Sequence, residues 1–451
     1  MPGPVDGVPP AWTVFPFVAF LVAVAALPLV APKFWHPNRN KLLLSLAVGL
    51  PVAVYLLAAT DYGAGRLAHV ALEFSAFISL LGALYVISGG IRFKGSLAGT
   101  PLTNTVILGI GGLMASFIGT TGASMLLIRP LLRANESRLR KAHVVVFFIF
   151  IVSNTGGLLT PLGDPPLYLG FLRGVPFLWT LKLLVPWLIV NGSLLAIFNI
   201  VDQRIFAREE LERPGAQLED VQKIREPLSI EGGFNFIWLG MLVAFIYAAG
   251  AWGGRLFENH DTLVFVLIGG FCALASFSWA TTRSGVRLAN RFTWSPILEV
   301  AAIFAGIFVT MDPALKLVEA KGASLGLQHP GQFFWATGLL SSVLDNAPTY
   351  LTFTALGTAV VNAADPGAGI TADHLAPFAA HPAGAPLLAA ISCGAVFMGA
   401  MTYIGNGPNF MVKAIADENQ VKMPSFLAYM GWSVAVLVPL FAVLTLVWFT
   451  G

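Results

Sequence analysis

The sequence predicts an all-α membrane protein built from two inverted-topology repeats. The first observation behind this prediction is composition: 56% of the 451 residues are hydrophobic and 11% are charged, whereas a soluble domain carries about 25% charged residues. The second observation is pattern. About ten long apolar segments are accompanied by two apolar hairpins with polar tips, and Gly and Pro interrupt two of the spans.

Composition also narrows the possible partners and chemistry. The net charge is only +3 and the Lys and Arg residues cluster in loops, so we expect membrane lipid, and no nucleic acid, as a partner. Cys272 and Cys393 both lie in apolar stretches and provide no disulfide framework or CxxC metal site. No H-E-x-x-H motif occurs, and Pro161 stands where an intramembrane aspartyl protease has the first Gly of G-x-G-D. We therefore expect neither an enzyme nor a bound cofactor.

Membrane-spanning segments can be located by length, because a helix needs about 20 apolar residues to cross a bilayer. Two apolar stretches, 101–132 and 331–358, have polar centres and are not typical of simple spans. Ten other segments meet the length requirement with few charges: 13–32, 42–60, 71–90, 142–160, 178–200, 234–252, 262–280, 295–311, 386–402 and 425–450.

The basic residues predict the sidedness of these spans. Six loops hold 20 of the 26 Lys and Arg residues, and one of these loops is the hydrophilic stretch 202–230. Loops rich in Lys and Arg face the cytoplasm. Placing all six inside puts both the N-terminus and the C-terminus outside, in a protein that we expect in a bacterial inner (plasma) membrane.

The two remaining apolar stretches cannot cross the bilayer in this topology. Stretch 101–132 lies between two inside loops, so it has to enter and return on one face, with a tip at 119–124 that reads GTTGAS. Stretch 331–358 lies between two outside loops and has a tip at 344–349 that reads LDNAPT. We expect two re-entrant hairpins with half-length arms. Non-helical backbone at membrane depth has to be covered by protein or line a water-filled cavity, so the hairpins imply an internal cavity.

Two spans carry the same interruption. The segment from Thr160 to Pro166 reads TPLGDPP and the segment from Thr402 to Pro408 reads TYIGNGP, which share the pattern T-x-[LI]-G-[DN]-x-P. Gly and Pro stop a helix in mid-membrane and leave amide and carbonyl groups free. Such half-helix ends can hold ions, and inverted repeats with discontinuous helices are the usual site architecture of secondary transporters.

The halves of the chain therefore match in order and have opposite orientation. Each has three spans, a hairpin, an interrupted span and a final span. We expect the following organisation: a first repeat at 1–200 with hairpin 101–132 and broken helix 142–173, a cytoplasmic linker at 201–233, and a second repeat at 234–451 with hairpin 331–358 and broken helix 386–416.

Two acidic residues fall where the chain leaves helical geometry. Asp164 lies in the first break and Asp345 at the second hairpin tip. Intramembrane carboxylates are costly and usually functional, and a buried carboxylate can take up either Na⁺ or H⁺. We expect both to bind the coupling ion, with Asp345 the better candidate; the alternative is that each only caps a helix. The other candidate ion- or substrate-binding residues are Thr120, Thr121, Asn154, Thr155, Gly163, Asn346, Thr349, Gly405 and Asn406.

At these motifs the chain resembles the ion transporter superfamily, above all its sodium/proton antiporters and the related citrate-transporter group. Four segments carry the resemblance: 153–157 (SNTGG), 160–166, 344–348 (LDNAP) and 405–409 (GNGPN). The resemblance implies a homodimer in which each subunit has a scaffold domain and a moving transport domain that holds the hairpins and the broken helices.

The resemblance leaves the substrate open between a cation and a carboxylate. In the citrate and dicarboxylate branch the hairpin tips typically read Ser-Asn-Thr and bind Na⁺ and carboxylate together, whereas here they read Thr120-Thr121-Gly122 and Asp345-Asn346-Ala347. Because Asp345 would repel an anion, the sequence favours a Na⁺/H⁺ antiporter that exchanges ions at midplane carboxylates by alternating access. The alternative is a Na⁺- or H⁺-coupled citrate or dicarboxylate transporter. A channel would not need two interrupted helices and two hairpins.

Overall fold

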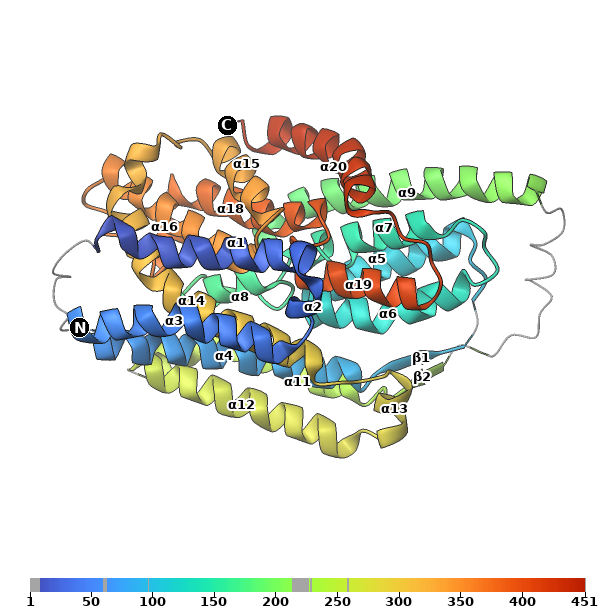
Figure 1. Cartoon of the computed structure of the whole chain (residues 1–451), viewed down its shortest axis with the longest axis horizontal. Coiled ribbons are helices and arrows are strands. Elements are labelled where there is room, and N and C mark those ends of the chain that lie inside the picture. The colour runs from blue at the N-terminus through green and yellow to red at the C-terminus, as the bar shows by residue number, and fades with distance from the viewer. Residues whose placement is uncertain are drawn as a thin grey trace.

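A computed structural model describes residues 9–59, 63–95, 97–212, 227, 229–257 and 259–450. Almost all of its regular structure is helical (Figure 1). Two short strands, β1 (Arg92–Lys94) and β2 (Ser229–Glu231), form an antiparallel ribbon in which Arg92 lies opposite Glu231.

The α-helices and short 3₁₀-helices (η) follow one another as listed by their bounds: η1 Ala11–Thr13, α1 Val14–Val30, α2 Pro32–Trp35, α3 Asn38–Ala59, α4 Gly63–Gly89, α5 Pro101–Ile118, α6 Thr120–Ala134, α7 Ala142–Ile151, η2 Thr155–Leu158, α8 Pro165–Leu172, η3 Phe177–Leu183, α9 Leu184–Glu212, α11 Asn235–Leu256, α12 His260–Thr281, α13 Ser284–Ala289, α14 Ser295–Lys321, η4 Gly322–Leu325, α15 Pro330–Ser341, α16 Asn346–Ala364, α17 Ala376–Ala380, α18 Gly384–Met398, η5 Gly399–Met401, α19 Gly407–Glu418 and α20 Phe426–Trp448.

Within the described residues, ten helical stretches are long and apolar enough to cross a membrane. The chain is thus an all-α membrane protein, which confirms the predicted fold class. Nine of these stretches coincide with the expected spans. The tenth is Pro101–Ile118, in place of the expected segment 142–160. That segment falls short because its α-helix, α7, ends at Ile151, where the backbone turns into the first break.

The helices form two groups. The panel holds α1 to α4 and α11 to α14, residues 9–89 and 235–321, in which α3 packs against α14 and α4 against α12. The site unit holds α5 to α9 and α15 to α20, residues 97–212 and 330–450. In Figure 1, α3, α4, α11 and α12 lie along one side of the molecule, and α7, α9, α18 and α20 lie along the other. Both groups contain helices from both halves of the chain.

Both predicted hairpin regions form helix–turn–helix units inside the site unit. Helices α5 and α6 are joined by Gly119 alone, whose φ of +78° favours glycine because other residues rarely adopt it. Helices α15 and α16 are joined by residues 342–345. The 18 residues of α5 extend about 27 Å at 1.5 Å per residue, so this arm is longer than the expected half-length. Whether each hairpin enters and leaves the bilayer on the same side stays a prediction.

Both interrupted segments leave helical geometry at the repeated motif. Residues 152–164 separate α7 from α8, and residues 399–406 separate α18 from α19. A Cβ on Gly163 would lie 2.0 Å from the carbonyl oxygen of Gly157, and a Cβ on Gly405 would lie 2.6 Å from that of Gly399. Each break is therefore a tight crossing of two backbone segments that only glycine allows.

The threonine of the motif has the same role in both breaks. Thr160 donates its hydroxyl hydrogen bond to the carbonyl oxygen of Ser116 in α5, and Thr402 donates to that of Ser342, 2.5 Å away, after α15. Each threonine thus satisfies a carbonyl group at a hairpin turn that has no intrahelical partner. A hydrogen bond of the same kind thus joins hairpin and break in each half.

Helix α9 extends through the expected repeat boundary at residue 200 and ends at Glu212. One face of its last turns is buried: Asp202 and Glu209 are buried there, and each lies 2.8 Å from the guanidinium of Arg138. His143, at the start of α7, is also buried and lies 2.9 Å from Asp202. The expected solvated linker thus begins later than residue 201, because these ion pairs anchor the helix; residues 213–226 and 228 lie outside the described part.

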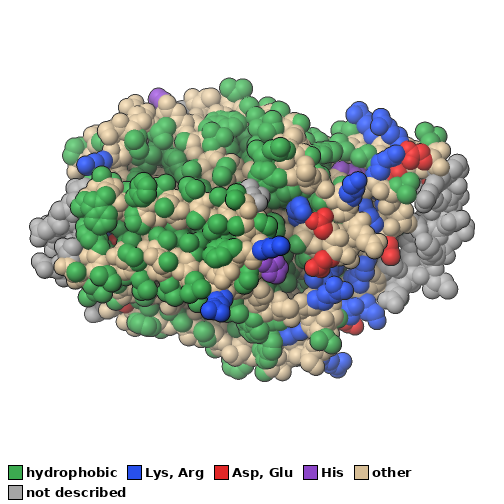
Figure 2. Space-filling view, in the orientation of Figure 1, with side chains coloured by type: hydrophobic (Ala, Val, Ile, Leu, Met, Phe, Trp, Pro, Cys, Tyr) green, Lys and Arg blue, Asp and Glu red, His purple; other side chains and the backbone are tan. Residues whose placement is uncertain are grey.

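Charged side chains collect at one end of the molecule. Figure 2 shows most of the Lys and Arg side chains on the visible face gathered towards the right-hand end, and many hydrophobic side chains over the remainder of that face. In Figure 1 the C-terminal end of α9 and the β1–β2 ribbon lie at this same end. Its assignment to the cytoplasmic side rests on the distribution of Lys and Arg and stays a prediction.

Candidate functional site

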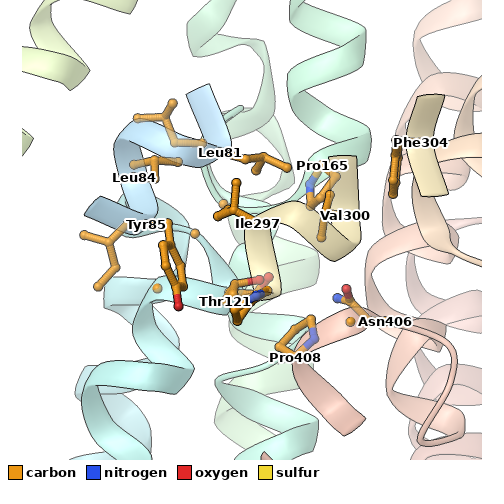
Figure 3. Close-up of a pocket in the computed structure, with 18 of the residues that line it drawn as sticks. Leu81, Leu84, Tyr85, Thr121, Pro165, Ile297, Val300, Phe304, Asn406 and Pro408 are labelled. Atoms are coloured by element: carbon orange, nitrogen blue, oxygen red, sulfur yellow. The ribbon is translucent and has the colours of Figure 1, made fainter. Parts of the chain in front are cut away.

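A cavity of about 90 Å³ lies where the first hairpin, the second hairpin and both breaks meet the panel (Figure 3). This volume accommodates several water molecules. The wall formed by the panel is mostly apolar and comes from α4 and α14: Leu81, Leu84, Tyr85, Pro296, Ile297, Val300 and Phe304. The wall formed by the site unit holds the polar groups: Ile118 to Gly122, Leu162, Gly163, Pro165, Asp345 and Asn406 to Pro408.

Four helices begin at this cavity. The first residues of α6, α8 and α19 (Thr120, Pro165 and Gly407) line it, as does Asp345, the residue that precedes α16. Helices α6, α8 and α19 have no side-chain cap. The N-terminal end of a helix carries a partial positive charge, and backbone N–H groups at such ends bind anions. Helix α8 contributes only the partial charge, because its first two residues, Pro165 and Pro166, have no N–H. The cavity is therefore suited to a negatively charged group.

Asp164 is the buried polar centre of the site, with 1% of its surface exposed. Its carboxylate accepts hydrogen bonds from Thr120 (2.9 Å) at the first hairpin turn and from Asn346 at the second. A third donor, the amide of Asn406 in the other break, lies 3.3 Å away. All three donors are neutral, and no described Lys, Arg or His forms an ion pair with Asp164. An ionised Asp164 would thus be solvated by these dipoles alone, with no counter-ion among the described residues.

The local sequence explains why Asp164 reaches across the site instead of capping its own helix. Helix α8 begins with Pro165 and Pro166, which have no backbone N–H to offer to a capping side chain. The N–H of Leu167 is bonded to the backbone carbonyl of Asp164, 3.1 Å away. The carboxylate therefore finds its donors on the two hairpins and the second break.

Asn346 has an unsatisfied acceptor beside this carboxylate. Its Nδ2 donates to Asp164, whereas its Oδ1 is buried and has no hydrogen-bond partner. Turning the amide round would bring Oδ1 against the carboxylate, which is unfavourable unless a proton lies between them. With the amide turned, a cation or a proton bound between Oδ1 of Asn346 and the carboxylate of Asp164 would satisfy both of these oxygens. The donor set thus fits a coupling ion, as hard cations prefer carboxylate and amide oxygens.

Asp345 has different surroundings. It lines the cavity and is half-buried. Its carboxylate accepts the backbone N–H of Ala347, 3.1 Å away, and Thr349 donates its hydroxyl to the backbone carbonyl of Asp345 at 2.9 Å. Asp345 therefore caps α16, the role considered as the alternative from the sequence, and it presents a charge to the cavity at the same time.

The structure brings most of the remaining predicted residues together. Thr121 and Gly163 line the cavity. Asn154 lies behind it and connects the breaks, because it donates to Asn409 at 2.7 Å and accepts from Asn406 at 3.2 Å. Three predicted residues point elsewhere: Thr155 binds Asn191 of α9, Thr349 binds its own helix, and Gly405 packs against the carbonyls of Ser341 and Ser342.

Two polar residues that support the site are absent from the sequence-based list. Asn409 donates to the carbonyls of Gly399 (2.8 Å) and Thr402 (2.9 Å) and so holds the second break in shape. Ser116 accepts the N–H of Leu159 at 3.1 Å and holds the first break. The sequence does contain a signal for both: each is a polar residue within an otherwise apolar segment. In membranes such a residue usually makes an interhelical hydrogen bond.

The geometry agrees with what a comparison with protein families finds. A family model described as "Putative citrate transport" matches residues 7–449. The chain belongs to this citrate-transport family. A search of curated proteins found no match.

Membership of the citrate-transport family supports a transporter rather than an enzyme, as the sequence predicts. It also bears on the substrate. The family description fits the carboxylate alternative better than the Na⁺/H⁺ exchange that we favoured from the sequence.

Proposed function

We propose that this protein is a secondary transporter that moves citrate or a similar small carboxylate together with Na⁺ or H⁺. The observation that carries the proposal is the convergence of four helix N-termini on one cavity, three of them without a side-chain cap. Backbone amides at helix N-termini hold a carboxylate without any Lys or Arg. The cavity lining, as the structure describes it, contains no Lys or Arg, so a carboxylate bound there would depend on these helix ends.

Asp345 then supplies the coupling between anion and cation. Its carboxylate lines the cavity and would repel a carboxylate substrate. Binding of Na⁺ or H⁺ at Asp345, and at the Asp164–Asn346 pair behind it, would remove this repulsion. A substrate that binds well only after the ion has bound is transported together with it, because differential affinity is what links the two equilibria.

Exchange of Na⁺ for H⁺ without a carboxylate is the second candidate. The observation that favours it is the buried Asp164, which has only neutral donors around it and accepts from the Nδ2 of Asn346, an amide whose Oδ1 is unsatisfied. A cation alone would complete that arrangement. The family description favours the carboxylate transporter.

Uptake into proteoliposomes separates the two candidates. Purified protein is reconstituted, and uptake of radiolabelled citrate is measured with an inward Na⁺ gradient, with an inward H⁺ gradient and with neither. A pH-sensitive dye inside the vesicles reports Na⁺/H⁺ exchange in the absence of citrate. We expect gradient-driven citrate uptake and no Na⁺/H⁺ exchange without citrate. Na⁺-driven proton movement without citrate, together with no citrate uptake, would contradict the carboxylate transporter and favour the Na⁺/H⁺ exchanger.

We also propose the assembly and placement that the sequence and the family resemblance imply. The protein would work as a homodimer in a bacterial inner membrane, with both termini outside. Light scattering of the purified protein in detergent measures the subunit number, and a single-subunit mass would contradict the homodimer.

A further inference from the structure

The panel and the site unit are joined at one end by a charged contact. Arg66, near the start of α4, donates through two guanidinium nitrogens to the carboxylate of Asp373, at 2.7 and 2.9 Å. The third nitrogen of the same guanidinium pairs with Asp312 of α14. Arg66 and Asp312 belong to the panel, whereas Asp373 lies between α16 and α17 of the site unit. A bidentate Arg–carboxylate pair of this kind is a strong and directional contact.

A second ion pair crosses between the same two units nearby. Arg173, at the end of α8, pairs with Glu73 of α4 at 3.3 Å, and both side chains are buried. Arg173 also donates to the carbonyl of Ala372 at 3.2 Å. The N–H of Ala372 donates to Glu319 of α14, 2.9 Å away. These contacts connect two helices of the panel with α8 and the 372–373 loop of the site unit.

This contact lies at the opposite end of the panel from the cavity. On α4, which spans Gly63–Gly89, the contact uses Arg66 and Glu73, whereas the cavity is lined by residues 81–85. On α14, which spans Ser295–Lys321, the contact uses residues 312–319 and the cavity is lined by residues 296–304. Along both helices, the cavity and the ion pairs are therefore at opposite ends.

The cavity end has a much weaker electrostatic contact. There Arg291, which follows α13, and Glu418, at the end of α19, are 4.0 Å apart, with 73% and 65% of their side-chain surfaces exposed. An exposed ion pair contributes little, whereas removing one partner of a buried pair is strongly destabilising because the other charge is left unpaired. Among the described residues, the ion pairs between the two units are thus largely buried at one end and exposed at the other.

We infer that the pairs Arg66–Asp373 and Arg173–Glu73 form an ionic latch that closes the transporter at the end opposite the cavity. This inference rests on the proposed transport function, because alternating access requires the site to open at that end as well. The four residues are positioning residues for the cycle: they do not line the cavity, and they act by setting how often the two units separate at this end. Breaking the latch shifts the population towards the state that is open there.

Cysteine accessibility tests the latch without any transported substrate. In a background in which Cys272 and Cys393 are replaced by Ser and Ala, Thr121→Cys places one thiol in the cavity. A membrane-impermeant maleimide is applied from the latch side of oriented vesicles, and the rate of labelling is measured. We expect slow labelling in this background and an increase of about fivefold after Asp373→Asn. This is the population shift that follows from the loss of one partly exposed ion pair.

A matched control is available within the panel. The pair Lys41–Glu299 has the same 2.7 Å length as the first Arg66–Asp373 contact, and Glu299 is as exposed (40%) as Asp373 (41%), but this pair does not cross between the units. Glu299→Gln should leave the labelling rate unchanged. Glu73→Gln provides a second latch variant and should increase labelling as Asp373→Asn does.

Two outcomes would overturn the latch. One is unchanged labelling in both latch variants when gel filtration shows them to be monodisperse; the other is an equal increase in Glu299→Gln. Because labelling needs no substrate, a failure of citrate uptake with intact latch behaviour would contradict only the proposed function. Normal citrate uptake with no effect on labelling would contradict only the latch.

Discussion

Asp164 and Asp345 carry the same functional group but differ in what surrounds it. The carboxylate of Asp164 is held by neutral donors from both hairpin turns and from the other break, whereas that of Asp345 bonds its own helix and faces the cavity. Removing the charge therefore has a different consequence at each position. The first two predictions use Asn at both sites, because Asn keeps the shape and removes the charge.

Asp164→Asn should fold and lose ion-coupled transport. The new amide would place its NH2 against that of Asn346, which can turn round and offer the Oδ1 that is unsatisfied in the native protein. The lost interactions with a charged group contribute about 1.5–3 kcal/mol each, so we expect gradient-driven citrate uptake to fall by about tenfold or more. Full gradient-driven uptake by the purified variant would exclude Asp164 from ion coupling.

Asp345→Asn should keep its helix cap and change the ion dependence of transport. Asn caps a helix about as well as Asp, so we expect normal expression and an unchanged melting temperature. If Asp345 repels the substrate until an ion binds, the variant should take up citrate down its concentration gradient without an imposed Na⁺ or H⁺ gradient. Uptake that still depends on the ion gradient as in the native protein would show that Asp345 is only a cap.

At the scale of elements, the repeated break depends on backbone segments that cross without side chains. We predict that Gly163→Ala destabilises the protein by about 1–3 kcal/mol, the usual cost of inserting atoms into a packed site, because its Cβ would lie 2.0 Å from the carbonyl oxygen of Gly157. Gly240→Ala in α11 is the control, since nothing lies within 4 Å of its Cβ. Melting temperatures followed by fluorescence-detected gel filtration compare the two; equal values would contradict the crossing.

The hairpin formed by α5 and α6 should return to the side from which it enters. Single cysteines at Ser96 and Ser137, in the Cys-free background, test this. Ser137 is exposed after the end of α6, and Ser96 lies outside the described residues. Both should react with an impermeant maleimide from the cytoplasmic side only. Reaction from opposite sides would mean that this segment crosses the bilayer and would overturn the predicted topology.

At the scale of the whole molecule, the Arg66–Asp373 pair of the latch should keep both of its charges throughout the neutral pH range. Burial alone would raise the pKa of Asp373, but the hydrogen bonds and charge of Arg66 outweigh it and hold the pKa below its ordinary value. A carboxylate of this kind contributes stability above its unfolded pKa of about 3.9, and the contribution is lost as the pH falls through the lower folded pKa. The titratable and charged groups that surround it come from α4, α8 and α14: Arg66, His69, Glu73, Arg173, Asp312, Lys316 and Glu319.

The ratio of labelling rates between Asp373→Asn and the native latch should therefore stay constant from pH 6 to pH 8. Taking the ratio at each pH removes the change in reactivity of the thiol itself. A ratio that falls towards one within this range would mean that Asp373 titrates there, which is contrary to its pairing with Arg66.

Several features of this protein could be read from the sequence because they depend on neighbours along the chain. Apolar length predicted the all-α membrane fold, and Gly and Pro at 163–166 and 405–408 predicted that two helical segments are interrupted. The expected span at 142–160 shows the limit of such local information. Its apolar length suffices for a helix to cross, but the α-helix ends at Ile151 and the break that follows is bonded to α5.

The roles of the two carboxylates, by contrast, depend on tertiary contacts. Asn346 and Asp164 are 182 positions apart, and Asp164 and Asn406 are 242 apart, so no local pattern shows that three neutral donors meet one acid. The latch is of the same kind, because Arg66 and Asp373 are 307 positions apart. Sequence alone determined the all-α membrane fold and the positions of the two breaks, since hydropathy and backbone chemistry are local. Only the folded structure decided which helix N-termini and charges face one another, since that depends on how the two halves pack.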